Sequence, residues 1–128
     1  MAEKVAQFRL AKFEIIKSLI ETTENVAVSD ELNVEFKQES AVNDENRILK
    51  YKFETVISDK NKALNIDVIT IGTFEFDKDL PEEMKANFFK VNAPAILFPY
   101  IRAHVTTLTS LSGIKPIILP TINIAARN

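Results

Sequence analysis

The chain has 128 residues, a net charge of −2 and no cysteine, and 46% of its residues are apolar. These values predict one globular domain, residues 1–128, and exclude a disulfide framework and thiolate chemistry. The small negative charge gives no strong electrostatic source of affinity for nucleic acid.

The N-terminal residues Met1–Lys4 do not form a basic segment ahead of a long apolar core, so we expect no secretory signal. No uncharged apolar run approaches the roughly 18 residues that are needed to cross a bilayer. We therefore expect a soluble protein of the cytoplasm.

Residues 5–20 fit two local structures. Apolar residues such as Phe8 and Ile15 recur at roughly helical steps, whereas residues 11–19 alternate as a strand would. The periodicity alone slightly favours a helix. The polar stretch 21–31 predicts a loop.

Three further segments alternate between apolar and polar residues, as strands with one buried face do: residues 32–37, 49–57 and 64–76. Turns rich in Asn and Asp separate them, because these residues accept the backbone geometry of a turn. Together with a first strand before them, these segments would form a four-stranded antiparallel sheet.

The middle of the last of these strands, Val68–Ile71, is apolar on both faces. A half-solvated antiparallel sheet should be polar on its outer face. The second face therefore meets a subunit, a helix or a client chain, unless the strand is buried inside its own domain. Gly72 follows directly and indicates a bulge or a close backbone approach.

Two helices are expected after the sheet. Asp79 and Glu82 have the spacing of a capping box ahead of a short helix. Asn92 is suited to cap a second, longer helix, and Gly113 to end it. The apolar stripe of the longer helix consists of Leu97, Ile101, Val105, Leu108 and Leu111.

The longer helix contains Pro99, which removes a hydrogen bond and clashes with the preceding turn at a cost of about 3 kcal/mol. Packing must offset this cost, so we expect the helix to be held between other parts of the structure. Residues 91–128 contain three basic residues and no acidic one. An acid-free segment rich in Ile, Leu and Ala predicts a core or an interface.

The residue patterns of catalytic and metal sites are missing from the sequence. His104 is the single histidine and cannot form a multi-histidine metal site, and no cysteine is present to complete one. The two glycines, Gly72 and Gly113, exclude the usual phosphate-binding loops. Lys50 and Tyr51 fall on opposite faces of a strand, which argues against a nucleic-acid platform. We expect no enzyme, no cofactor and no metal.

With catalytic and metal sites poorly supported, the features that remain are apolar surface and a β-sheet. Such a domain can bind extended polypeptide along a sheet edge or in an apolar groove. Burying about 600 Å² of apolar client surface yields roughly 15 kcal/mol before opposing terms. Ordering about ten residues costs on the order of 10–20 kcal/mol. One groove would therefore bind weakly, and useful affinity needs several linked grooves in an oligomer.

The run Ile96-Leu97-Phe98-Pro99-Tyr100-Ile101-Arg102, together with the later Pro120-Thr121-Ile122-Asn123, resembles the SecB family of protein-export chaperones. The signature of that family has Asn-x-Leu-Phe-Pro-Tyr-x-Arg after the sheet and ends near Pro-x-x-Asn. The resemblance implies that residues 5–20 form a strand. It also implies an α+β fold: a four-stranded antiparallel sheet with one long C-terminal helix, and a short helix before it, packed on one face.

The resemblance further implies an ATP-independent holdase, a homotetramer built as a dimer of dimers, which holds unfolded preproteins and hands them to the translocase motor SecA. The client-binding residues would be Leu32, Val34, Phe36, Ile69, Ile71, Phe74 and Phe76. The oligomer interface would include Phe98, Tyr100, Ile101, Val105 and Leu108. Asp67 would serve in partner docking.

Two departures from the family pattern bear on these roles. The docking face of the family carries Leu-x-Glu where this chain has Asn65-Ile66-Asp67, so the acid is present but its apolar partner is not. The second helix of the family has no counterpart before Asn128, which predicts a shallower groove or one completed by another chain. A dedicated client such as a labile antitoxin, an adaptor that binds no client and a small-ligand domain are the alternatives.

Overall fold

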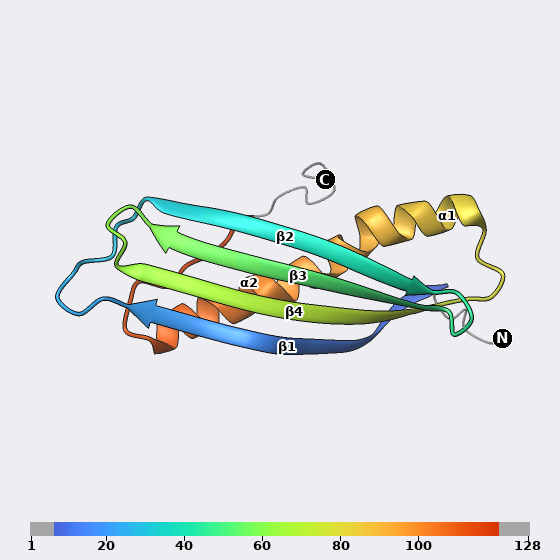
Figure 1. Cartoon of the computed structure of the whole chain (residues 1–128), viewed down its shortest axis with the longest axis horizontal. Helices are drawn as coiled ribbons and strands as arrows, with labels where there is room; N and C mark the ends of the chain where they lie inside the picture. The colour runs from blue at the N-terminus through green and yellow to red at the C-terminus, as the bar shows by residue number, and fades with distance from the viewer. Residues whose placement is uncertain (1–6, 121–128) are drawn as a thin grey trace, which may run out of the picture.

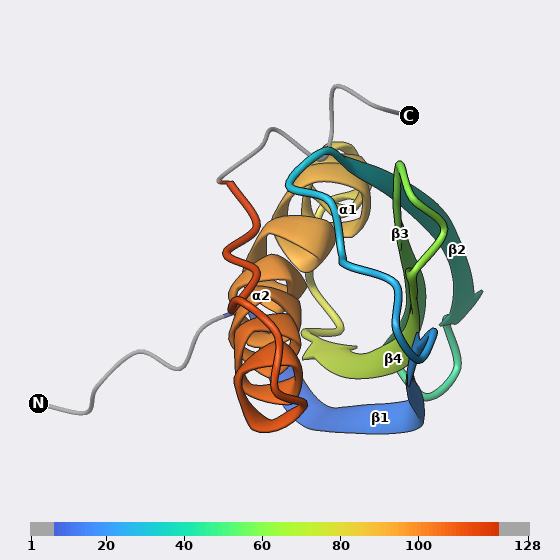
Figure 2. The ribbon, with the colours of Figure 1, turned by 90° about the vertical axis from the view of Figure 1, so that its left-hand side faces the viewer.

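In the computed structural model, which describes residues 7–120, four antiparallel strands form one sheet and the helices cover one of its faces (Figure 1 and Figure 2). The strands are β1 (Phe8–Thr22), β2 (Leu32–Asn43), β3 (Ile48–Asp59) and β4 (Leu64–Phe76), in the order β1-β4-β3-β2. The helical part consists of α1 (Glu82–Asn87), a π-helical turn η1 (Phe88–Asn92) and α2 (Ala93–Leu111). The predicted α+β fold is confirmed. The motif residues Thr121–Asn123 lie outside the described residues.

β1 is a strand, and two bulges explain why its sequence looks partly helical. Its register with β4 slips by one residue between Leu10 and Lys12 and again between Ile15 and Lys17. Each slip moves the following side chains to the other face. The helix-facing residues of β1 are therefore Phe8, Leu10, Phe13, Ile15, Ser18, Ile20 and Thr22. Their steps of two and three residues lie between the period of a strand and that of a helix.

The core lies between the helices and the central strands β3 and β4. Every second side chain of these strands points into it, as their alternating sequences predict. The fully buried side chains include Leu49, Phe53, Ile57, Ile66, Val68, Phe74, Leu97, Ile101 and Val105. Stacked aromatic rings close one end of this core, since Phe8 lies 4.8 Å from Phe74 and 5.1 Å from Phe88 between ring centroids.

Gly72 allows α2 to lie directly on β4. A Cβ atom at this position would stand 2.5 Å from Cδ2 of Leu97 and 3.0 Å from its Cδ1. Leu97 is itself completely buried, so its side chain has no open space to move into. The predicted close approach is confirmed. The alternative, a bulge, is not found, because β4 keeps its register through Gly72 with both neighbouring strands.

The capping box predicted at Asp79 is wrong. Pro81 is the residue that precedes α1, and no side chain caps this helix. The carbonyl of Pro81 instead accepts hydrogen bonds from the N–H groups of Met84 and Lys85. The fixed φ angle of proline already suits the start of a helix, so a capping side chain is not required.

Asn92 was also predicted as a cap, and this prediction is wrong. Asn92 has helical backbone angles and makes no capping hydrogen bond, because the chain stays helical through η1 into α2. Aromatic packing holds the segment against the sheet: Phe88 stacks on Phe8, and Phe89 lies 5.2 Å from Phe76 between ring centroids. This contact replaces the sharp helix start that the sequence suggests.

The end of α2 follows the prediction, since Gly113 has a φ of 80°, where only glycine is unstrained. The segment after it folds back along α2. The hydroxyl of Thr106 donates to the carbonyl of Ile117 at 2.8 Å, and the Ile117 N–H donates to the hydroxyl of Thr109 at 2.9 Å. Ile117 and Leu119 are buried in the core.

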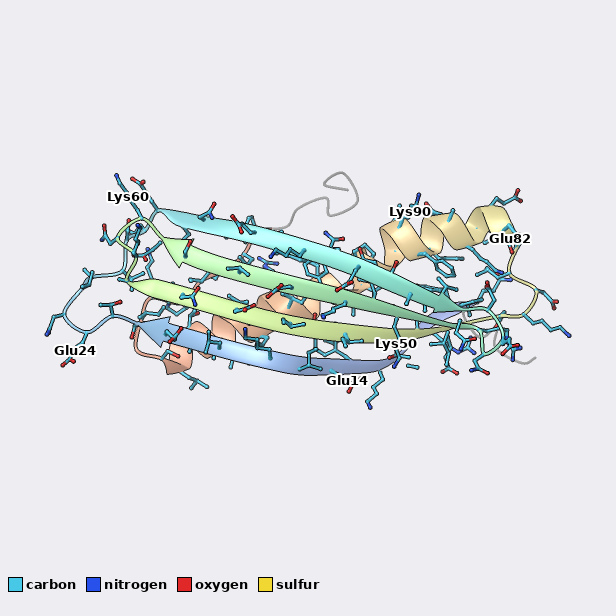
Figure 3. All side chains as sticks on the ribbon, viewed as in Figure 1. Glu14, Glu24, Lys50, Lys60, Glu82 and Lys90 are labelled. Atoms are coloured by element: carbon cyan, nitrogen blue, oxygen red, sulfur yellow. The ribbon has the colours of Figure 1, made fainter. Side chains whose placement is uncertain are left out.

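Asp59 holds the β1–β2 and β3–β4 connections by hydrogen bonds, at the end of the sheet where Figure 3 labels Glu24 and Lys60. Its Oδ2 accepts from the N–H of Ser29 at 2.8 Å, and its Oδ1 accepts from those of Ala63 and Leu64 at 2.7 and 2.9 Å. Burial alone would raise the pKa of Asp59, but these backbone hydrogen bonds outweigh it and lower the pKa. The carboxylate therefore stabilises the fold in its ionised form.

The contact between Gly72 and Leu97 makes a first prediction. The Gly72→Ala substitution forces the buried Leu97 to shift, and we expect it to lower the free energy of unfolding by about 1–3 kcal/mol. Chemical denaturation measures this loss. The double variant with Leu97→Ala should show less than the sum of the two single losses, and full additivity would contradict the account.

A second prediction concerns Asp59. Because its folded pKa is depressed, its contribution is present above the unfolded pKa of about 3.9 and is lost as the pH falls below it. Asp59→Asn replaces the oxygen facing the Ser29 N–H by an NH₂ donor, so the variant should melt below the wild type at pH 7. Thermal scans should show the difference shrinking towards pH 3. An unchanged difference would contradict this.

Candidate functional site

The helix-facing side of β2 is only partly covered. Leu32 is 37% exposed and Val34 is half-buried. Phe36 packs edge-on against Phe53 and Phe98, at 5.4 and 5.9 Å between ring centroids. Leu32, Val34 and Phe36 thus form an apolar strip along the edge of the sheet, the β2 track.

A hollow lies at each end of the β2 track. The first, of about 660 Å³, lies between the β1–β2 connection and the segment after α2, and Val26, Val28, Leu32 and Ile118 are among its lining residues. The second, of about 480 Å³, lies between β2 and η1 and is lined by Gln38, Glu39, Ser40, Tyr51, Phe89, Lys90 and Val91. A strand rises about 3.3 Å per residue, so Leu32 and Gln38 are roughly 20 Å apart. An extended segment of about six residues therefore spans the two hollows.

The opposite face of the sheet carries Ile69 and Ile71, both half-buried. Their register partners on β1 and β3 are charged residues: Glu14, Lys17, Lys52 and Glu54. Figure 3 shows this face towards the viewer, with Glu14 of β1 and Lys50 of β3 labelled. The apolar patch that the sequence predicts on this face is therefore present, but it is small and surrounded by charge.

Asp67 lies on the same outer face and is held by a lysine. The Nζ of Lys17 donates to its Oδ2 at 2.7 Å, whereas its Oδ1 is buried and has no hydrogen-bond partner within residues 7–120. A proton on the neighbouring Glu54 would supply that partner, and this hydrogen bond raises the pKa of Glu54. Burial alone would raise the pKa of Asp67, but the hydrogen bond from Lys17, together with the one that a protonated Glu54 would donate, lowers it.

The face of α2 that points away from the sheet carries almost no charge. Arg102 is the only residue of α2 that is charged at neutral pH. The exposed residues of the helix are Ala95, Pro99, Tyr100, Ala103, Thr107, Ser110 and Leu111, which we call the uncharged α2 face. A solvent-facing helix surface is normally polar or charged. The uncharged α2 face is therefore suited to contact with another apolar surface.

The predicted client-binding residues divide among three places. Leu32, Val34 and Phe36 form the β2 track, and Ile69 and Ile71 lie on the opposite face of the sheet. Phe74 and Phe76 are buried in the core, on the same side of the sheet as the helices.

The predicted interface residues also differ in exposure. The buried ones, on the sheet-facing side of α2, are Phe98, Ile101 and Val105. Leu108 is half-buried, and the side chain of Tyr100 is 50% exposed. The sequence reasoning did not single out Ala95, Ala103 and Thr107 of the uncharged α2 face, because small residues give no apolar signal. The signal that could have found them is the lack of charge on the outward helix positions.

His104 joins α2 to β1. Its Nε2 lies 2.8 Å from the hydroxyl of Ser18, and burial lowers its pKa. No cluster of three or more His, Asp or Glu residues suited to a metal ion is found in the described part of the chain. None of the helices within residues 7–120 is long and apolar enough to cross a membrane.

Comparison with known protein families identifies the family of this chain. The family model described as preprotein translocase subunit SecB matches residues 11–127. The chain belongs to the SecB family. It is 43% identical over 54 residues to an uncharacterized protein of Methanocaldococcus jannaschii and 35% identical over 54 residues to the protein-export protein SecB of Anaplasma phagocytophilum. Each match covers 42% of this SecB family chain and 34% of the relative, so it spans about a third of the length of these relatives.

Solved structures share the fold of this SecB family chain. A SecB-like chaperone of Mycobacterium tuberculosis, in complex with a peptide from an antitoxin, superimposes with a TM-score of 0.75 at 14% identity, over 91% of this chain and 88% of that one. A protein of unknown function from Streptococcus agalactiae gives a TM-score of 0.56 at 12% identity, over 92% and 100% of the two chains. At these identities the likeness shows the fold alone.

A third prediction follows from His104. Its folded pKa lies below the unfolded value of about 6.5, so the unfolded chain binds the proton more tightly. Stability should be full above pH 6.5 and should decrease as the pH falls towards 5.5. The His104→Gln variant keeps a polar partner for Ser18 without titrating, so its melting temperature should fall less over this range. Equal decreases would contradict the assignment.

Proposed function

We propose that this SecB family chain is an ATP-independent holdase that binds unfolded polypeptides in apolar grooves of a homo-oligomer in the cytoplasm. The observation that carries the proposal is the β2 track with a hollow at each end. An unfolded chain presents short apolar stretches in extended form, and the track has the length and chemistry to receive one. No step of such binding requires a nucleotide.

The β2 track by itself supports only weak binding. Fully burying an apolar side chain contributes about 1.5–3 kcal/mol, and the three side chains of the track are already partly buried. The gain must also exceed the entropy lost when the client segment is ordered. Several tracks acting on one client chain would overcome this limit, because the second contact is intramolecular.

Oligomerisation through the uncharged α2 face would provide these linked tracks. Tyr100, which stacks on Phe13 at 5.0 Å between ring centroids, lies at the β1 side of this face. Tyr100 and Leu108 would touch the partner directly. The interface would depend indirectly on the buried residues of α2, Phe98, Ile101 and Val105, because they fix the position of the helix on the sheet. The family resemblance favours a homotetramer built as a dimer of dimers.

Two client classes fit the proposal. The curated relatives named protein-export protein SecB support a role in protein export. The family resemblance then implies preproteins delivered to SecA, with Asp67 as a docking residue. The Mycobacterium tuberculosis structure with its antitoxin peptide supports a dedicated client instead. Saturable binding to SecA that is lost in Asp67→Asn would favour export, and no binding would favour the dedicated client.

The fourth prediction tests the holdase role. The purified chain should suppress the aggregation of a chemically unfolded client at near-stoichiometric ratio, without ATP, as measured by light scattering. Leu32→Ser should weaken client binding about fivefold, because it removes about 1 kcal/mol of apolar burial. Ile71→Ser is the matched control on the opposite face and should have little effect.

The outcome separates the alternatives. No suppression at several-fold excess of the chain would favour an adaptor that binds no client. A loss of binding in Ile71→Ser, with Leu32→Ser unchanged, would place the client on the outer face of the sheet instead of the β2 track.

A further inference from the structure

Exposed apolar side chains gather where α2 lies beside β1. Ile15 of β1 is 40% exposed, and Tyr100 and Leu111 of α2 are 50% and 83% exposed. Tyr100, His104 and Leu111 project from one side of α2, because steps of four and seven residues are close to whole helical turns. Figure 2 shows α2 next to β1. We call Ile15, Tyr100, His104 and Leu111 the β1–α2 patch.

His104 is the member of the β1–α2 patch that can change its charge near neutral pH. It is the single histidine of the chain. It is half-buried, and its Nε2 lies 2.8 Å from the hydroxyl of Ser18. Because burial lowers its pKa, the imidazole is neutral at pH 7, and the patch then carries no charge.

Within α2, the charged residue lies far from His104. The residues one turn away from His104 are uncharged at neutral pH: Tyr100, Ile101, Thr107 and Leu108. Arg102 lies about 160° around the helix from His104. It lines a hollow on that far side together with Ile118 of the segment that follows α2.

The strands also present no acid to His104. The charged side chains of β1 point to the outer face of the sheet, where Lys17 pairs with Asp67 at 2.7 Å. The helix-facing residues of β4 are uncharged. The helix-facing acid of β3, Asp59, is bound by N–H groups at the end of the sheet. A proton on His104 would therefore have no counter-charge among residues 7–120.

A second copy is the partner that the β1–α2 patch fits. In the two-fold contact that most homo-oligomers use, a surface packs against the same surface of its partner. A charged surface repels itself in such a contact, whereas an uncharged one does not. The β1–α2 patch and the adjoining uncharged α2 face carry no charge at neutral pH and contain no acid. They can therefore pack against themselves, and a charged partner would find no opposite charge there.

We propose that a second copy covers the β1–α2 patch in a two-fold contact, and that protonation of His104 breaks this contact. The inference rests on the proposed function and deepens it, since it states what controls the oligomer. Protonation places a positive charge on each of two surfaces that face each other. The contact also excludes the water that would solvate these charges, so neither charge is compensated.

Proton linkage gives the direction of the effect. The contact buries His104 further, so an assembled copy binds the proton less tightly than a free copy does. The dissociation constant of the contact therefore rises as the pH falls below the pKa of His104 in the free copy. Each two-fold contact contains His104 twice, so the rise can reach about hundredfold per pH unit.

Light scattering after size exclusion, over a dilution series at pH 7.5 and pH 5.0, tests the inference. The wild type should be an oligomer at pH 7.5, and its dissociation constant should rise by about tenfold or more at pH 5.0, with folding verified by circular dichroism. His104→Gln keeps a polar partner for Ser18 without ionising, so its dissociation constant should change less than about threefold. No rise in the wild type, or an equal rise in His104→Gln, would overturn the inference.

Two further variants exclude other sources of the pH response. Glu54→Gln is the matched control, because the pKa of Glu54 is also shifted but its side chain lies on the outer face. This variant should respond to pH as the wild type does, and a lost response would assign the proton to the outer face. His104→Lys is charged at both pH values and should be dissociated already at pH 7.5. A wild-type mass for a folded His104→Lys would contradict the proposed contact.

The two proposals can fail separately. If the oligomer binds reduced, carboxymethylated lactalbumin but its mass is the same at both pH values, the holdase proposal stands and the role of His104 is wrong. If the chain is a monomer at pH 7.5 and binds no lactalbumin, both are wrong. If His104→Lys keeps its oligomer but loses the lactalbumin, the β1–α2 patch faces a client instead of a second copy, and the inference is wrong.

Discussion

The seating of α2 on β4 is the constraint on which the rest of the structure depends. Leu97 occupies the space that any side chain at position 72 would need, so the helix lies directly against the central strands. This close contact allows Ile101 and Val105 to be fully buried although α2 contains an interior proline. It also fixes which face of the helix points outward, and that face carries almost no charge.

The distribution of charge distinguishes the surfaces that are suited to water from those that are suited to a partner. All 18 acidic residues of the chain lie within residues 1–90, and the sheet face that the helices leave open is covered with ion pairs such as Lys17–Asp67. A surface of that kind is stable in water. The uncharged α2 face and the β2 track are different, because the side chains that form them are apolar or uncharged. Exposed apolar patches of this kind mark interaction sites. The two surfaces lie on the same side of the sheet, so an oligomer formed through one would bring several copies of the other together.

Much of the fold could be predicted from the sequence, because its signals are local. Strict alternation identified β2, β3 and β4, and the single glycine of β4 marked the approach of α2. β1 was ambiguous, since its two bulges change the spacing of the apolar residues from the period of two that a strand should show. The two helix starts were wrong for different reasons. Pro81 begins α1 without a side-chain cap, and packing of Phe88 and Phe89 against the sheet keeps the chain helical through Asn92.

The site was harder to predict, because apolar periodicity does not distinguish burial within a chain from burial between chains. Phe74 and Ile101 carry the same signal as Val34, yet the first two belong to the core of the chain itself. The parity of β4 already places Ile71 and Phe74 on opposite faces, and their sequence positions alone could have shown it. The hollows at the ends of the β2 track depend on loops and on η1, whose positions follow from tertiary packing and not from any local pattern.

The central claim is that one copy of this chain has more apolar surface than it can cover, and that other copies and unfolded clients cover the rest. The most direct test is light scattering after size exclusion, with and without a reduced, unfolded polypeptide. The account predicts a mass that is a multiple of 14.5 kDa, most simply four copies, and a further increase when the polypeptide is added. A monomer of 14.5 kDa whose mass does not change with the polypeptide would contradict it.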